Sequence, residues 1–306
     1  MDVRHLDLLR ELAERGSVTA VARATHRTPS AVSQQLQTAQ RELGARLVEP
    51  AGRGVRLTEA GELLARRAVD VATVLADVRA EWDAYLDDPS GTVSVMALPS
   101  AGEFLLPGAL VRLEGSGIRV RCHDADVAEA DWAAMTNDHD IVIGHSLRGH
   151  RPLGTVELLV TPIVREPLDI ALPAHHPLAV NRAVRPSDLL TERWIGVPVG
   201  FPFDTVREAV EESIGAPLQV HQRVRDNRLV EALVAAGQGV AVLPRFTTRP
   251  REDVVLRPLA GIDTGRYIVA IQRPDRARRL AVRRTMEEIG QVAEGLRGAA
   301  GTSLAE

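Results

Sequence analysis

A stripe of polar residues between positions 30 and 41 has the composition of a surface that reads DNA. Its members recur at helical spacing and are Ser30, Ser33, Gln34, Gln37 and Arg41. Hydroxyl, amide and guanidinium groups hydrogen-bond to base edges in the major groove. Solvated helix faces usually carry mixed charges instead. We interpret the stripe as a DNA-reading face, with an ordinary solvated face as the alternative.

The residues around this stripe predict the helix that positions it. Thr28 is suited to cap a helix, Pro29 to occupy its first position, and Gly44 to end it. We include Thr28 and Pro29 among the DNA-contacting residues. The opposite stripe is apolar and is predicted to face a core; it comprises Val32, Leu36, Ala39 and Leu43.

Two shorter helices are predicted before the stripe. An amphipathic pattern over residues 2–14 is followed by Gly16, which ends the first helix. Ser17 is suited to cap a second, short helix, and His26 and Arg27 form the turn that leads to Thr28. This arrangement of short helix, tight turn and capped helix predicts a helix-turn-helix.

A hairpin is predicted after Gly44. Strand-like segments flank Gly52-Arg53-Gly54, so Arg53 lies at the tip, and Arg53 and Arg56 complete the predicted DNA-binding residues. Residues 1–58 are therefore predicted to be an all-α winged helix-turn-helix domain. They carry a net charge of +3 while residues 59–306 carry −7, which suits an N-terminal segment facing a polyanion.

A long helix without proline is predicted to follow Thr58, giving a linker over 59–90 with a hinge at 87–91. Apolar residues alternate along it at spacings of four and three. This period is typical of a helix–helix interface, with packing on its own domain as the alternative. We expect self-association through Leu64, Ala68, Val71, Leu75, Val78 and Trp82, a seam that Tyr85 continues.

The remaining residues, 91–306, alternate short β-rich runs with helical stretches at 125–135, 204–214 and 227–236. This alternation predicts an α/β architecture with mostly parallel strands. A segment of this length is expected to divide into two lobes, with a ligand cleft at the carboxyl ends of the strands.

Side chains that follow predicted strands are the candidates for that cleft. Ser100 is expected to cap the helix after the first strand, where its hydroxyl and the helix N–H groups hold a carboxylate, unless it serves only as a cap. Opposite charges at Asp124 and His145 favour a zwitterion or a hydroxylated acid. The expected effector-binding residues are Ser100, Ala101, Asp124, His145, Ser146, Val199, Phe201 and Phe203.

Several enzyme classes are excluded because all 37 basic residues are arginine. Without lysine there is no pyridoxal-phosphate Schiff base, no Walker A loop and no kinase lysine. Gly144-His145-Ser146 invites comparison with a nucleophile elbow, but Arg148 stands where that motif needs glycine. The histidines lack metal-ligand spacing, and the single Cys122 is expected to be a buried, inert thiol. We expect neither an enzyme nor a cofactor.

Longer motifs resemble the LysR-type transcriptional regulators. GSVTAVARATHRTPSAVSQQLQTAQRELGARLVE and GRGVRLTEAGE resemble that family near the N-terminus, and GTVSVMALPS, ALPAHHPLA and LVAAGQGVAVLP follow in the family's order. Two places depart from its pattern. Ala39-Gln40 stands where the family often has Leu-Glu, and Val48-Glu49-Pro50 replaces Phe-Glu-Arg, which removes one expected phosphate contact near the wing.

The resemblance implies a DNA-binding winged helix-turn-helix, a dimerising linker helix and a two-lobed α/β effector domain resembling a periplasmic binding protein. Lobe I would comprise residues 91–162 and 266–306, and lobe II residues 163–265. The implied partners are a double-stranded DNA operator, a small-molecule effector and further copies of the chain, as a dimer or tetramer.

A different class of function stays open, namely a small-molecule-binding module whose helix-turn-helix contacts protein or is inactive toward DNA. Two further features bear on location. No apolar run approaches the roughly 20 residues that span a bilayer, and one cysteine suits a reducing compartment. We expect a cytoplasmic protein without a membrane partner.

Overall fold

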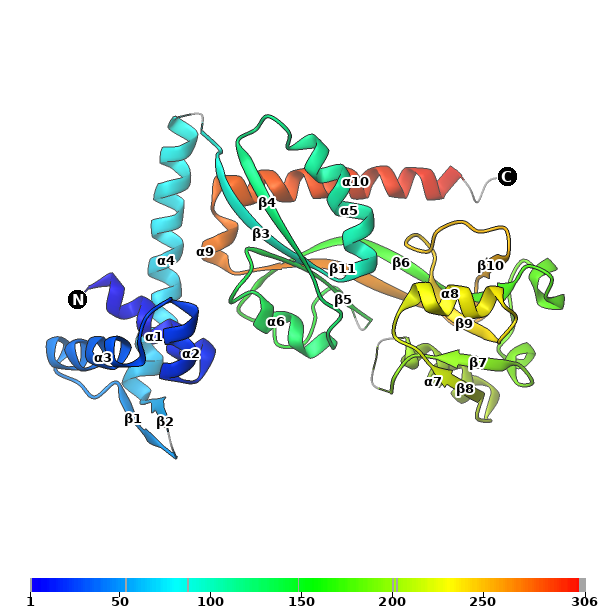
Figure 1. Ribbon diagram of the computed structural model, residues 1–306, viewed down its shortest axis with the longest axis horizontal. Helices are drawn as coiled ribbons and strands as arrows, with labels where there is room; N and C mark the ends of the chain where they lie inside the picture. Colours follow the sequence, from blue (N-terminus) through cyan, green and yellow to red (C-terminus); the bar gives the residue numbers. More distant parts are fainter. Residues whose placement is uncertain are drawn as a thin grey trace. The chain divides into compact units, whose positions relative to one another are not determined.

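The computed structural model describes residues 2–52, 54–86, 88–147, 149–199, 201 and 203–302 (Figure 1). The chain forms two compact units. The first unit comprises Met1–Gly91 together with Arg273–Arg284, and the second comprises Thr92–Gln272 together with Thr285–Glu306. Each unit is described by itself.

Three helices open the first unit: α1 (Val3–Arg15), α2 (Val18–Ala24) and α3 (Pro29–Leu43). Their ends confirm the predicted caps. The side chain of Ser17 accepts from the Ala20 N–H and that of Thr28 from the Ala31 N–H, while Gly16 and Gly44 end their helices in the left-handed conformation that glycine adopts without strain.

The predicted hairpin is present and lies against the next helix. Strand β1 (Val48–Ala51) pairs antiparallel with β2 (Gly54–Leu57). Helix α4 (Glu59–Tyr85) follows, with the Thr58 side chain accepting from the Gly61 N–H. A Cβ at Gly61 would lie 2.2 Å from the Leu47 carbonyl oxygen, so only glycine permits this close approach.

The core of the first unit contains the predicted apolar stripe of α3. Val32, Leu36 and Ala39 are buried and Leu43 is partly buried. The other core residues come from α1, α2, the segment just before β1 and the start of α4, and include Leu8, Leu9, Leu12, Val21, Leu47 and Ala65. Burial of one face of α3 leaves its polar stripe on the opposite side.

Helix α4 differs from the predicted seam because its two halves have different environments. Leu64 packs against the core of the first unit and Ala68 is only 1% exposed, so these two residues are not available to a second chain. The later seam residues are exposed: Leu75 by 50%, Val78 by 60% and Trp82 by 54%. Val71 lies between, half-buried.

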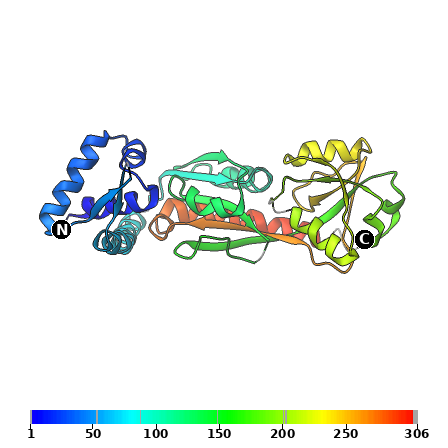
Figure 2. The ribbon, with the colours of Figure 1, turned by 90° about the horizontal axis from the view of Figure 1, so that it is seen from below.

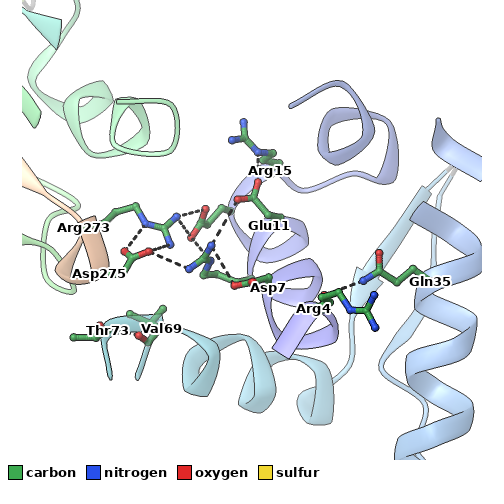
Figure 3. A network of polar contacts seen from close by, with 11 residues as sticks. Arg4, Asp7, Glu11, Arg15, Gln35, Val69, Thr73, Arg273 and Asp275 are labelled. Atoms are coloured by element: carbon green, nitrogen blue, oxygen red, sulfur yellow. Dashed lines mark hydrogen bonds and ion pairs between the residues drawn. The ribbon is translucent and has the colours of Figure 1, made fainter. Parts of the chain in front are cut away.

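A segment from late in the sequence belongs to the first unit. It contains α9 (Pro274–Ala277), which packs against α4, and Arg273 just before it. The Arg273 guanidinium donates to both Glu14 carboxylate oxygens at 2.6 and 2.7 Å, and Arg10 of α1 donates to Asp275 at 3.2 Å (Figure 3). This ion-pair network joins the segment to α1.

The second unit is built on a nine-stranded sheet. Its strand order is β4-β3-β5-β11-β6-β9-β7-β8, and β10 pairs with β6 beside this path. The strands are β3 (Gly91–Ala97), β4 (Ile118–Asp124), β5 (Ile141–Ser146), β6 (Leu159–Pro173), β7 (Arg193–Gly196), β8 (Gln219–Arg223), β9 (Val240–Pro244), β10 (Val254–Arg257) and β11 (Gly265–Gln272).

Strand β6 divides this sheet into two lobes. It pairs with β11 along residues 159–167 and with β9 and β10 along residues 168–173, so it contributes to both lobes (Figures 1 and 2). Strands β3, β4, β5 and β11 lie in one lobe, and β7, β8, β9 and β10 in the other. A single long strand thus serves both lobes.

The expectation of mostly parallel strands is wrong. Strand β5 is parallel to β3, and β7 is parallel to β8 and β9, but β11 runs antiparallel to both β5 and β6. The physical reason is the return of the chain from the second lobe to the first, which brings β11 into the sheet between β5 and β6 from the opposite direction.

Helices cover this sheet. They are α5 (Pro99–Arg112), α6 (Trp132–Met135), α7 (Asp204–Ile214), α8 (Asn227–Ala235) and α10 (Leu280–Thr302). Short 3-10 helices lie at Glu129–Asp131, Pro177–Val180 and Pro186–Leu189. The helices predicted at 204–214 and 227–236 are confirmed, whereas 125–135 holds only the 3-10 turn and the single turn of α6.

Candidate DNA-reading surface and ligand cavity

The polar stripe of α3 is presented to solvent. Gln34, Gln37 and Arg41 are exposed, and Ser33 is half-buried beside them. Their positions are set by the buried side of the same helix, which leaves the amides on the outer face. Such a face can donate to and accept from base edges.

The start of α3 is exposed as well. Thr28, Pro29 and Ser30 all lie at the surface. The Thr28 hydroxyl oxygen is occupied as the helix cap and lies 3.0 Å from the Ser30 hydroxyl. These residues frame the first turn of α3, where unpaired backbone N–H groups favour an anion such as a phosphate.

Of the two hairpin arginines that were predicted to bind DNA, the structure describes one, Arg56. Arg56 is exposed and lies 2.6 Å from Glu49 across the β1–β2 pairing, so its charge is partly balanced within the wing. Arg53, predicted at the hairpin tip, lies outside the described residues.

Two other glutamines of α3, Gln35 and Gln40, make hydrogen bonds within the domain and are not part of the outer polar stripe. The Gln35 amide donates to the Arg4 carbonyl oxygen at 2.9 Å (Figure 3), and the Gln40 side-chain oxygen accepts from the Leu47 and Val48 N–H groups. Gln40 thereby fixes the entry to the hairpin, at a position where the family resemblance often places an acid.

A cavity of about 300 Å³ lies in the second unit, with lining residues from both lobes. Its apolar wall includes Leu98, Pro99, Val197, Phe201 and Phe203. The polar lining residues are Ser100, Glu103, Asp126, His145, Arg225, Asp226, Asn227, Arg228, Glu231, Thr247, Arg249 and Arg266. This size suits a small metabolite.

The structure brings together half of the predicted effector set. Ser100, His145, Phe201 and Phe203 line the cavity. The other four do not: Ala101 and Ser146 are buried, and Asp124 and Val199 are exposed elsewhere. Ser146 donates instead to Glu129 at 2.9 Å, and Asp126 lines the cavity in place of Asp124.

Ser100 is not a helix cap, so that prediction is wrong. Helix α5 begins at Pro99 with Leu98 as its N-cap residue and no capping side chain. Ser100 lies inside the first turn, and its hydroxyl oxygen accepts from the Arg266 guanidinium at 2.9 Å. The chain order Leu98-Pro99 determines this, because proline favours the first helical position.

Arg266 is the central charged residue of the cavity. Its side chain is 3% exposed and pairs with the buried Glu166 at 2.7 Å. One of its nitrogens also donates to the Ser100 and Thr247 hydroxyls, at 2.9 and 3.0 Å. Glu166 further accepts from the Phe246 and Thr247 N–H groups, so both ions of the pair are well supplied with hydrogen bonds.

His145 is the second buried polar residue of the lining. It is 4% exposed, and its ring meets the Trp132 ring edge-on with centroids 5.7 Å apart. Burial, aided by the positive charge of Arg266, lowers the pKa of His145 to about 3. The imidazole is therefore neutral at pH 7, so the positive charge that was expected here, opposite in sign to Asp124, is absent.

Exposed ion pairs join the two lobes beside the cavity. Glu103 of α5 pairs with Arg228 of α8 at 2.6 Å and with Arg249 after β9. Burial raises the pKa of Glu103, but the hydrogen bonds and charges of the two arginines outweigh it and lower that pKa overall. Arg225 stacks on Phe201, with its guanidinium carbon 4.6 Å from the ring centroid.

The arginines of the cavity were missing from the sequence prediction. That prediction considered only the carboxyl ends of strands. Arg266 lies at the start of β11, which reaches the carboxyl end of β5 because the two strands are antiparallel. An arginine at the start of an otherwise apolar strand, GRYIVAIQ, was the one available signal.

Cys122 is exposed on β4, which corrects the expectation of a buried thiol. Desolvation nevertheless raises the pKa of this thiol. Among the described residues, no three His, Cys, Asp or Glu side chains are grouped as metal ligands. Within the same residues, no helix is long and apolar enough to cross a bilayer.

Two protein-family models match this chain. The model described as "Bacterial regulatory helix-turn-helix protein, lysR family" matches residues 3–62, and "LysR substrate binding domain" matches residues 86–294. Together they cover residues of both units of the structure.

The chain is also similar to individual proteins over most of its length. The chain is 27% identical to "Transcriptional dual regulator GltC" of Bacillus subtilis (strain 168) over 83% of this chain and 85% of the relative. The structure of a full-length OxyR variant from Pseudomonas aeruginosa matches with a TM-score of 0.65 and 20% identity, over 96% and 94% of the two chains. The structure of CbnR with its target DNA matches with a TM-score of 0.52 and 19% identity, over 96% and 100%.

Proposed function

This chain belongs to the LysR family of transcriptional regulators, and we propose that a small-molecule effector in its lobe cavity modulates its binding to operator DNA. The observation that supports this best is the cavity itself, where the buried Arg266 and two hydroxyls face space for a small molecule. Burial of polar groups costs free energy, so a buried guanidinium and two hydroxyls beside a hollow favour a role in ligand binding.

The DNA-binding part of the proposal rests on α3. Gln34, Gln37 and Arg41 read bases, and the first turn of α3 together with Arg53 and Arg56 holds phosphates. The uncharged amides supply sequence preference, whereas the cations supply affinity that falls with salt. CbnR, a structural relative, is seen in complex with its target DNA.

Self-association completes the proposal. We assign the interface to the exposed part of α4, with Leu75, Val78 and Trp82 at its centre and Val71 at its edge. An apolar row this exposed in a single chain is typical of a helix that packs against a partner. A two-fold dimer would present two copies of α3 to two half-sites.

DNA binding is tested by Gln34→Ala in fluorescence anisotropy with the DNA upstream of the protein's own gene and a scrambled duplex. Loss of one amide contact is expected to reduce the preference for the operator by about tenfold. Gln238→Ala, an exposed glutamine of the second unit, is the matched control. A parent protein that binds neither duplex would favour the alternative function, a ligand-binding module inactive toward DNA.

Self-association is tested by Leu75→Asp in light scattering. A carboxylate among apolar neighbours is expected to halve the mass of the assembly and to weaken operator binding, because two half-sites are no longer held together. An unchanged mass would show that the interface lies elsewhere on the chain.

A further inference from the structure

Glu231 of α8 is a buried carboxylate that lines the cavity without a partner. Its side chain belongs to a residue only 8% exposed. Among the described residues, no hydrogen bond or ion pair joins its carboxylate to another group. Glutamate is almost never buried in proteins unless it is paired, because water no longer stabilises its charge. Glu231 is therefore a site that a ligand in the cavity can complement.

The other carboxylates of the lining each have a partner nearby. The Asp226 side chain caps α8 and accepts from the Leu229 N–H at 2.9 Å. Asp126 lies 3.8 Å from the Arg225 guanidinium, and Glu103 pairs with two arginines as described above. The acid without a partner is thus one residue of the lining, at a defined place on α8.

The arginines nearest to Glu231 are held by other acids. Arg228 and Arg249 both pair with Glu103, and Arg251 pairs with Asp253 at 2.7 Å. Burial raises the pKa of Glu231, and the charges of these three arginines offset that effect only in part. The positive charge around Glu231 therefore does not replace a direct partner.

The Glu231 carboxylate is accessible from the cavity. Its oxygens are not among the described side-chain atoms that are both fully enclosed and unbonded, so the exposed surface that Glu231 retains includes them. Asn227 lies one helical turn earlier on the same face of α8 and also lines the cavity, half-buried. Its side-chain carbonyl oxygen is a second acceptor beside the carboxylate.

The charges of the lining favour a cation at this place. The lining holds four carboxylates and four guanidinium groups, but one of these, Arg266, is already balanced by the buried Glu166 behind it. One negative charge of the lining is left without a counter-charge. A neutral donor would satisfy the hydrogen bonds of Glu231 but not its charge, whereas a cationic nitrogen satisfies both.

We infer that the ligand of this cavity carries a positively charged nitrogen group, an ammonium or a guanidinium, that binds between Glu231 and Asn227 on α8. The inference rests on the proposed function and narrows its effector to organic cations and zwitterions. The cationic group donates to the carboxylate of Glu231 and to the side-chain oxygen of Asn227.

The test compares matched compounds that differ in one cationic group. Isothermal titration calorimetry of the full chain, without DNA, measures three pairs: phenethylamine and 2-phenylethanol, 5-aminopentanoate and 5-hydroxypentanoate, and arginine and citrulline. In at least one pair, the cationic member is expected to bind about tenfold more tightly than its neutral counterpart, because only the cation supplies a counter-charge to Glu231.

Variants connect that preference to Glu231. Glu231→Gln keeps the shape of the side chain and removes its charge, so it is expected to bring the two members of the pair within about twofold of each other. Glu231→Asp keeps the charge on a shorter side chain and is expected to retain part of the preference, which tests the site even if the glutamine variant fails to fold. Glu212→Gln, at an exposed glutamate of α7 outside the lining, is the control and keeps the full preference.

The inference is wrong if no cationic compound binds more tightly than its neutral counterpart, or if the preference survives in Glu231→Gln. These outcomes leave DNA binding untouched, since no duplex is present. Failure of the proposed regulator function would instead appear as absent operator binding by the parent protein, in the anisotropy experiment.

Discussion

Two buried arginines at opposite ends of one strand have different surroundings. Arg266 lies in β11 and Arg273 follows its last residue, Gln272. Their side chains are 3% and 5% exposed, and each pairs with a glutamate. Arg266 belongs to the second unit and Arg273 to the first.

The partners of the two arginines differ. Glu166, the partner of Arg266, is fully buried, and Arg266 also donates to two hydroxyls that line a cavity. Glu14, the partner of Arg273, is partly exposed, and the rest of its network is made of the charged groups Arg10 and Asp275 (Figure 3). The first arrangement leaves donors for a ligand, whereas the second consists of charged side chains that pair with one another and hold α9 to α1.

The largest expected difference between the two clusters is in stability. Glu166→Gln keeps the shape of the side chain but leaves the Arg266 charge buried without a counter-charge. We expect it to lower the free energy of unfolding by about 3–5 kcal/mol, measured by urea denaturation. Glu212→Gln, an exposed glutamate of α7, should change it by less than about 0.5 kcal/mol. A cost below about 1 kcal/mol for Glu166→Gln would mean that water reaches Arg266.

The second-largest expected effect is a loss of folding stability at acid pH, which arises from His145 in the cavity cluster and has no counterpart in the Arg273 cluster. The pKa of His145 in the folded protein, about 3, lies below its unfolded value of 6.5, so between these values the unfolded state binds more protons. Stability should therefore fall as the pH is lowered, by about 2 kcal/mol from pH 7 to pH 5 for this residue alone. Urea denaturation at both pH values should show this loss reduced in His145→Gln and unchanged in His175→Gln. Equal pH dependence of all three proteins would contradict a buried, neutral His145.

A smaller cost is expected at the Arg273 cluster. Glu14→Gln removes a charged acceptor of two hydrogen bonds, but solvent reaches the site, so a loss of about 1.5 kcal/mol is expected. A double-mutant cycle that combines Glu14→Gln with Arg273→Gln measures the coupling energy between these two residues in the same denaturation experiment. A loss for Glu14→Gln as large as the loss for Glu166→Gln would erase the distinction between the two clusters.

The smallest effect is expected where an ion pair is exposed. Glu103→Gln breaks the pairs with Arg228 and Arg249 at the surface, and such pairs contribute less than about 1 kcal/mol each. Added salt should reduce the difference between this variant and the parent in urea denaturation, because exposed charges are screened. A salt-independent loss would indicate that the lobes bury these charges in solution.

Local signals made the first unit predictable. Ser17, Thr28 and Thr58 cap helices and Gly16 and Gly44 end them, and each of these roles depends on neighbours within a few residues. The predicted seam of α4 was wrong at Leu64 and Ala68, which pack within the chain. Its spacing predicted one apolar face, but spacing carries no information about which part of that face packs on the protein's own core.

The cavity was less predictable because it depends on strand direction. Phe201 and His145 were predicted from their places near the carboxyl ends of strands, where a parallel sheet gathers its ligand contacts, although His145 is itself a residue of β5. Arg266 was missed because β11 is antiparallel, and its pairing with β5 joins residues far apart in the sequence. The neutral state of His145 likewise results from its burial by residues that are far away in the sequence, and a local sequence pattern does not reveal such burial.

The exposed Cys122 on β4 gives the protein a single chemical handle. It is the one cysteine of the sequence, so a maleimide dye attaches at one defined place per chain. The raised pKa of its thiol keeps the thiolate scarce at neutral pH, so labelling is slow there. The labelling rate rises as the pH is raised. Copies labelled with donor and acceptor dyes would then report, by energy transfer, how far apart their β4 strands lie when the chains assemble.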